Sequence, residues 1–89
     1  MILKVVRQIK KGEPGWFEGL GSRTEIFSGV CHLENFYDGN EDLFYDIGFE
    51  KGNHALLKIT EKQNENESVA IVNQLWLMDD KGNTIEKLI

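Results

Sequence analysis

The sequence predicts an all-β protein: a single small domain of about six strands, mostly antiparallel, arranged as a strongly bent sheet or a small barrel. Three observations support this fold class. β-branched and aromatic residues are spread along all 89 residues. Short runs of alternating apolar and polar side chains are separated by turn-forming residues. No segment shows the helical periods of roughly 10 to 15 residues that a parallel α/β fold requires.

The first strand is predicted over residues 2–9, which are rich in β-branched side chains. The following segment, residues 11–22, holds four of the nine Gly residues and the only Pro, so it predicts a loop. Trp16 and Phe17 are adjacent in this loop. Because neighbouring side chains on an extended chain point to opposite sides, we expect one ring to fill the core and the other to lie on the surface.

The middle of the chain predicts two more strands with a loop between them. The first covers residues 23–33, and the second covers residues 43–50, whose alternating side chains are typical of a half-buried strand. Residues 34–42 contain an Asp-Gly-Asn sequence, which is typical of turns, and therefore predict the connecting loop. A short helix within residues 40–46, with Asn40 as its N-cap, is the alternative at the start of the later strand.

The last third of the chain predicts a strand over residues 54–62, a polar loop over residues 63–68 and a β-hairpin over residues 69–89. The hairpin turn, residues 79–83, contains Gly82, which can adopt the positive φ that such turns need. A domain of this size buries a single small core. The side chains that we expect in this core include Ile59, Ile71, Leu75 and Leu77.

No segment of the sequence predicts secretion or membrane insertion. The N-terminal apolar run is too short and too interrupted by charge for a signal peptide. No run approaches the roughly 20 apolar residues of a membrane span. Cys31 is the only Cys, so no internal disulfide can form. We therefore expect a cytoplasmic protein without a membrane segment.

No residue pattern predicts catalysis, and we expect the protein not to be an enzyme. Cys31 is the one candidate nucleophile, but on a strand its neighbour His32 would point to the opposite face and could not act as its base. His54 could act as that base only if the fold brings it close to the thiol. We therefore assign no catalytic residue.

No metal or cofactor site is predicted either. One Cys and two His lack the CxxC or HxxxH spacing of zinc sites. Asp38, Asn40 and Asp42 alternate as at the start of a calcium loop, but the Gly and Glu that complete such a loop do not follow. Gly19 and Gly21 are not followed by the third Gly of a dinucleotide-binding loop.

Charge segregation is the strongest functional signal in the sequence. Between Arg23 and Lys51 there are seven acidic residues and no Lys or Arg, so the net charge of −5 comes from the middle of the chain. Aromatic residues alternate with these acids, which predicts a surface that binds a protein partner with a basic surface. The predicted partner-binding residues are Phe36, Tyr37, Asp38, Glu41, Asp42 and Asp46. A solvated acidic face that only keeps the protein soluble is the alternative.

A small, acidic, β-rich chain without catalytic spacing is typical of accessory proteins that bind and block, such as inhibitors carried by phages and mobile elements. We therefore predict an inhibitor or adaptor that covers a basic site on a nucleic-acid-handling or defence protein. We expect no direct binding to nucleic acid. A structural component of a larger assembly is a further alternative.

A second binding hypothesis concerns the Gly-rich part of the first loop, residues 12–22. Backbone amides of such a loop, together with flanking cations, can hold a nucleotide or another small anion, and a homodimer interface would enclose it. Glu13 and Glu18 in the same loop count against an anion. The residues assigned to this alternative site are Arg7, Lys11, Trp16, Gly19, Gly21 and Arg23.

Overall fold

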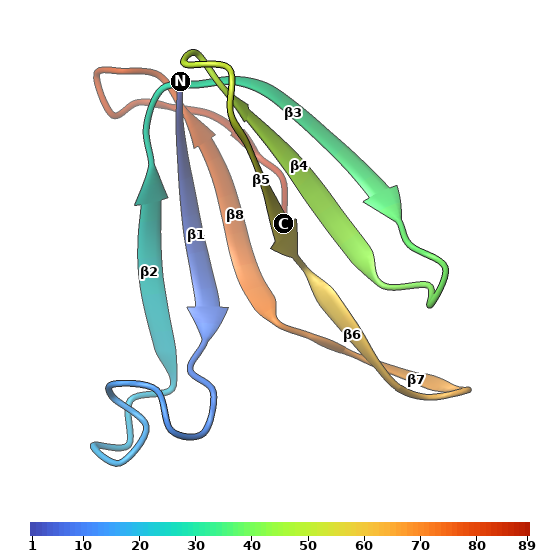
Figure 1. The fold of residues 1–89 in the computed structure, drawn as a ribbon. Coiled ribbons are helices and arrows are strands. Elements are labelled where there is room, and N and C mark those ends of the chain that lie inside the picture. Colours follow the sequence, from blue (N-terminus) through green and yellow to red (C-terminus); the bar gives the residue numbers. More distant parts are fainter.

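The computed structural model describes residues 1–89 and contains strands and connecting loops only. The predicted all-β class is confirmed, but the structure has nine strands. In chain order they are β1 (Ile2–Gln8), β2 (Ser22–Phe27), β3 (Val30–Tyr37), β4 (Leu43–Phe49), β5 (His54–Lys58), β6 (Thr60–Asn64), β7 (Glu67–Ala70), β8 (Val72–Met78) and β9 (Thr84–Lys87). They form three antiparallel sheets, ordered β2-β1-β8-β9, β3-β4-β5 and β6-β7, and no sheet closes into a barrel (Figure 1).

Bends carry the chain from one sheet directly into another at three places. Gly29 precedes β3, Ile59 separates β5 from β6, and Ile71 separates β7 from β8. Gly29 has a φ of +69°, a conformation that Gly adopts without strain. The Ile59 carbonyl accepts the N–H of Ile71 at 2.7 Å, which ties two of the bends together. The bends divide each of the strands predicted over residues 23–33 and 54–62 into two.

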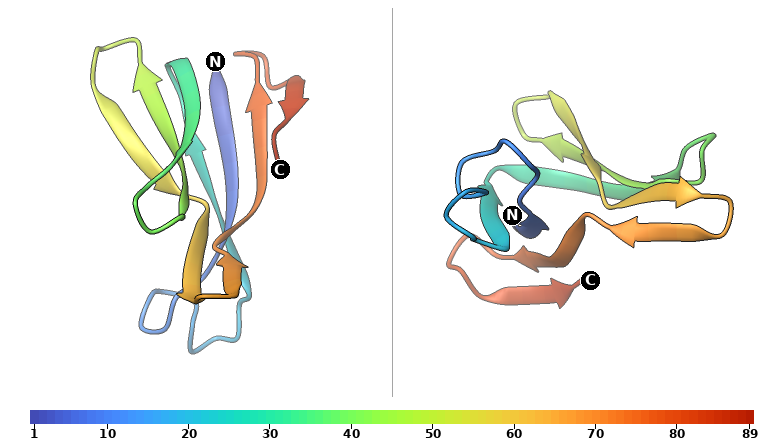
Figure 2. Two further views of the ribbon diagram at one scale, coloured as in Figure 1. Left: turned by 90° about the vertical axis from the view of Figure 1, so that its right-hand side faces the viewer. Right: turned by 90° about the horizontal axis from the view of Figure 1, so that it is seen from below.

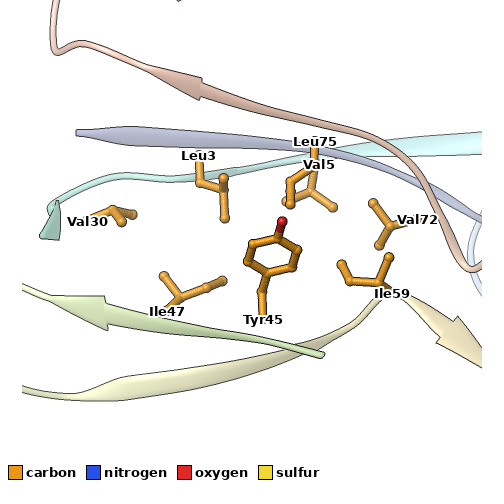
Figure 3. Close-up of a cluster of buried hydrophobic side chains, with 8 residues drawn as sticks. All are labelled: Leu3, Val5, Val30, Tyr45, Ile47, Ile59, Val72 and Leu75. Atoms are coloured by element: carbon orange, nitrogen blue, oxygen red, sulfur yellow. The ribbon is translucent and has the colours of Figure 1, made fainter. Parts of the chain in front are cut away.

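The two larger sheets face each other and enclose the hydrophobic core (Figures 2 and 3). The core side chains are Leu3, Val5, Val30, Tyr45, Ile47, Ile59, Val72 and Leu75. The predicted burial of Ile59 and Leu75 is confirmed, whereas Ile71 and Leu77 are only half-buried. Ile71 lies at a bend and Leu77 lies next to the end of β8, where the facing sheet gives less cover than at the strand centres.

Strand β3 corrects the prediction for the middle of the chain. It extends to Tyr37, so the loop predicted over residues 34–42 is reduced to its second half. The helix predicted as an alternative within residues 40–46 is wrong, because Leu43 begins β4 and Glu41 has a φ of +64°, outside the helical region. Cross-strand pairing with β4 supplies partners that turn-forming residues alone do not reveal.

The predicted Gly-rich loop is confirmed, but its aromatic residues do not fill the core. Trp16 is 43% exposed and Phe17 is 86% exposed. Ile9 is buried at the base of the loop. It packs so closely on Gly15 that a Cβ added to Gly15 would lie 3.1 Å from the Cδ1 atom of Ile9. The apolar contact that we expected from an aromatic ring is thus made by an aliphatic side chain.

Two hairpins complete the chain. The polar loop predicted over residues 63–68 is instead a hairpin, in which β6 and β7 pair around a two-residue turn. The hairpin predicted at the C-terminal end is confirmed in β8 and β9, with Gly82 at a φ of +88°. The Asp79 carboxylate accepts the N–H groups of Asn83 and Lys81, each at 2.9 Å, and backbone bonds of this kind lower the pKa of Asp79.

The structure contains no helix that could cross a membrane.

Candidate functional site

The outer face of the β3-β4-β5 sheet carries two of the residues predicted to bind a partner, Phe36 and Asp46. Alternation along β4 directs Tyr45 and Ile47 into the core, so Phe44, Asp46 and Gly48 lie on the opposite face. Strand register extends this face into three cross-strand rows. The rows are Phe36–Phe44–Lys58, Glu34–Asp46–Leu56 and His32–Gly48–His54.

Exposed apolar side chains form one part of this face. The rings of Phe36 and Phe44 stack with centroids 5.5 Å apart and an interplanar angle of 12°. Leu56 lies on the same face and is 65% exposed. Tyr37 is 70% exposed, but it directly follows Phe36 and pairs with Leu43, which packs on the core, so the predicted partner-binding residue Tyr37 belongs to the other face of β3. Isolated exposed apolar residues are ordinary, but a group of this kind on one sheet is typical of a binding surface.

Carboxylates and imidazoles form the other part. Asp46 Oδ1 lies 3.0 Å from His54 Nδ1, and Glu34 Oε2 lies 3.5 Å from His32 Nε2. The two imidazole centroids are 6.3 Å apart across Gly48. A Cβ on Gly48 would lie 2.9 Å from the Cβ of His32, so only Gly leaves room for this arrangement. We call the group Glu34, Phe36, Phe44, Asp46 and Leu56 the aromatic–acidic face.

Asp42 does not belong to this face, and its assignment to partner binding is corrected. Asp42 is only 6% exposed. The carboxylate accepts the Lys62 N–H at 2.7 Å and pairs with the Lys58 ammonium at 3.4 Å. Asp42 therefore joins the loop after β3 to β5 and β6, which is a structural role. A sequence does not distinguish such a buried acid from its exposed neighbours.

The other two acids of this loop are also engaged within the chain. Asp38 Oδ1 accepts the N–H groups of Asn40 and Asp42, each at 2.9 Å, and so shapes the loop. Glu41 is exposed and pairs with Lys62 at 3.1 Å. The charge segregation of the sequence is thus partly cancelled in space, because β5 and β6 bring cations to these acids.

Lys58 is another cation that pairs with acids, in this case Asp42 and Glu61. Desolvation alone would lower its pKa, but hydrogen bonds to Glu61 and Asp42 raise the pKa above its usual value. The carboxylates that remain outside the lysine pairs on the sheet are Glu34 and Asp46, each facing a His.

The alternative site in the Gly-rich loop is only partly assembled. Both terminal nitrogens of Arg7 bond the Glu13 carboxylate, at 3.0 and 2.8 Å, and its Nε bonds Glu25. These carboxylates raise the pKa of Arg7, and the Arg7 hydrogen bonds lower the pKa of Glu13 to about 2. Arg7 is therefore committed to two acids. Gly19, Gly21 and Arg23 line no hollow in the structure.

Lys11 and Trp16, in contrast, line one wall of an open hollow of about 710 Å³. The other wall is formed by the β6-β7 hairpin and the bend that follows it. The complete lining is Gln8, Ile9, Lys10, Lys11, Trp16, Glu61, Gln63, Val69 and Ile71. A volume of roughly 300 to 1,000 Å³ is typical of small-molecule sites.

The candidate nucleophile has no assembled base. Cys31 is exposed, and neither imidazole forms a hydrogen bond with it, since His32 and His54 face Glu34 and Asp46. The structure holds no group of three or more His, Cys, Asp or Glu side chains arranged to bind a metal ion.

Sequence reasoning missed Glu34, Phe44 and Leu56 as members of the face. Period-two alternation from Asp46 would have indicated Phe44, but only the strand register places Glu34 and Leu56 beside them.

Comparison with protein-family models, with curated proteins and with solved structures found no match to this chain.

Proposed function

We propose that this protein is a small binding module, an inhibitor or adaptor, whose aromatic–acidic face docks on a basic and partly apolar site of a protein partner. One observation carries the proposal. A stacked Phe pair and an exposed Leu lie beside two carboxylates on a sheet face whose opposite side holds the core.

The two kinds of side chain would divide the work of binding. Phe36 and Phe44 offer large apolar area with few rotatable bonds, and such aromatic anchors commonly dominate affinity. Glu34 and Asp46 would steer a basic partner and fix its orientation, which raises the association rate more than the affinity. Glu41 would contribute little, because Lys62 already neutralises it.

A basic partner site suggests a partner that handles nucleic acid. Lys- and Arg-rich surfaces bind phosphate backbones, so a protein that covers such a surface would compete with nucleic acid for it. This competition gives the proposal its sharpest test.

The test is photo-crosslinking from the face itself. A benzoylphenylalanine replaces Leu56 in one variant and Ile85 in the control, since Ile85 is similarly exposed but lies on β9 in the other large sheet. Both variants are irradiated in host lysate, with and without heparin as a competing polyanion. We expect a discrete crosslinked partner from position 56 only, and heparin should suppress it.

Binding kinetics with the captured partner then separate the two roles. Phe36→Ala should speed dissociation, and Glu34→Gln with Asp46→Asn should slow association and flatten its salt dependence. The controls are Ile85→Ala and Glu65→Gln with Glu67→Gln. Equal crosslinking from positions 56 and 85, or resistance of the crosslink to heparin, would contradict the proposal.

A further inference from the structure

A second surface of the molecule, separate from the aromatic–acidic face, combines unpaired cations with an exposed aromatic ring. It is the hollow between the Gly-rich loop and the β6-β7 hairpin. Lys10 and Lys11 line it, and neither ammonium group forms an ion pair in the structure. The Trp16 side chain lies on the same wall and is 43% exposed in total.

The loop that presents these residues is held in one shape. Glu13 receives both terminal nitrogens of Arg7 and also the Lys10 N–H at 2.9 Å. Trp16 N–H donates to the Glu13 carbonyl at 3.1 Å, and the Trp16 carbonyl accepts the Gly19 N–H at 3.2 Å. The loop backbone that carries Lys10 and Trp16 is therefore preorganised, which lowers the entropic cost of binding a ligand.

The opposite wall is apolar with two polar groups. Val69 and Ile71 supply the apolar surface, and Gln63 and Glu61 supply an amide and a carboxylate. Glu61 does not repel an anion at full strength, because Lys58 pairs with it at 3.4 Å. Two positive charges thus remain without a partner in the hollow.

We propose that this hollow binds a free mononucleotide, with the base stacked on Trp16 and the phosphate held by Lys10 and Lys11. Base–aromatic stacking accepts any base because every base has a π-face. The Gln63 amide and the Glu61 carboxylate can bond amino and ring-nitrogen groups on the edge of a base.

The charges favour a single nucleotide over a nucleic-acid strand. Proteins that bind a strand neutralise many phosphates along a basic groove. In this hollow only Lys10 and Lys11 offer ammonium groups that form no ion pair. The whole chain carries a net charge of −5, which repels a polyanion.

The test is a fluorescence titration in which Trp16 is the reporter. Trp76→Phe removes the other Trp, and this variant is titrated with AMP, GMP, CMP and UMP, with inorganic phosphate and adenosine as separate arms. We expect saturable quenching of Trp16 by a mononucleotide in the micromolar to millimolar range. Phosphate alone and adenosine alone should bind at least roughly tenfold more weakly, because each uses only half of the site.

Variants then locate the site. Lys10→Ala with Lys11→Ala should weaken nucleotide binding roughly tenfold or more, whereas Lys51→Ala with Lys81→Ala, an equal charge change elsewhere, should leave it unchanged. Amide chemical-shift mapping on the unmodified protein keeps the test independent of the folding of any variant. Shifts should be confined to residues 8–16 and 61–71.

Four outcomes would overturn the proposal. They are the absence of saturable binding by any mononucleotide, binding that survives loss of both lysines, shifts that map elsewhere, and tighter binding of a short oligonucleotide than of every mononucleotide. None of these outcomes bears on the aromatic–acidic face, which lies on another sheet.

Discussion

Strand β4 has two faces that differ in almost every physical respect. On the inner face, Tyr45 and Ile47 are buried between the two larger sheets. On the outer face, Phe44 stacks on Phe36 and Asp46 lies beside His54, and both Phe44 and Asp46 are only half-buried. The same backbone hydrogen bonds position both sets, because the strand pairs with β3 on one side and β5 on the other.

This difference indicates which substitutions should affect stability and which should affect binding. Inner-face side chains are packed on all sides, so any change in their volume affects folding. Outer-face side chains have few partners within the chain, so changes there should alter binding with little effect on folding. The core is small, with 11 of 89 residues buried, which makes the inner face especially sensitive.

Truncation of the inner face should have the largest effect. Ile47→Ala removes fully buried methyl groups and should lower the free energy of unfolding by about 2 to 5 kcal/mol, measured by urea denaturation. The control is Leu56→Ala on the outer face, which should cost less than about 1 kcal/mol. Similar losses for both variants would remove the distinction between the faces.

Asp42 should show the next largest effect, because it is the buried polar group that joins three segments. Asp42→Ala leaves the Lys62 N–H without its acceptor and should cost about 1 to 3 kcal/mol. Asp42→Asn retains an acceptor oxygen and should cost less. Substitution of an exposed partner-binding residue should leave the stability unchanged. Unchanged stability of Asp42→Ala would therefore contradict the structural role of Asp42.

The stacked ring pair on the outer face should contribute a smaller, measurable coupling. A double-mutant cycle with Phe36→Ala and Phe44→Ala should give an interaction energy of about 0.5 to 1.5 kcal/mol in unfolding experiments. A coupling near zero would indicate that the rings do not stack in solution and are free to contact a partner independently.

The smallest effect should come from Glu13, at the surface beside Arg7. Its folded-state pKa of about 2 lies below the ordinary value of 4.5, so its stabilisation is present above pH 4.5 and is lost as the pH falls through 2. Glu13→Gln should therefore reduce the acid sensitivity of unfolding in this window. Glu18→Gln, an exposed loop acid without an ion pair, is the control and should keep the wild-type pH profile.

Local sequence patterns predicted the parts of the fold that local chemistry determines. Alternation indicated β4, and the turn residues 79–83 with Gly82 indicated the hairpin of β8 and β9. Residues 34–37 and the β6-β7 hairpin were missed, because their polar side chains favour loops and only cross-strand pairing makes them strands.

The candidate site was predicted less completely for a related reason. The aromatic residues Phe36 and Tyr37 are exposed as expected, but only Phe36 shares a face with Asp46. The lysines that neutralise Glu41 and bind Asp42 come from later strands, so no pattern in the acidic segment reveals them. Charge arithmetic along a chain is reliable only where segments distant in sequence stay apart in space.

The pairing of β1 with β8 has a consequence for the way this chain folds. Every other ladder joins strands that are neighbours in the sequence, whereas Val5 lies opposite Leu75 with most of the chain between them. Closing so long a loop costs entropy before any contact is gained, so we expect this step to limit the folding rate. Val5→Ala should slow refolding in stopped-flow experiments, while Val69→Ala in the local β6-β7 hairpin should mainly speed unfolding.

During synthesis, one edge of β1 therefore stays unpaired until the ribosome has released β8. An open strand edge of this kind can pair with other chains. The interval between the emergence of these two strands is thus the period in which the nascent protein is most exposed to aggregation.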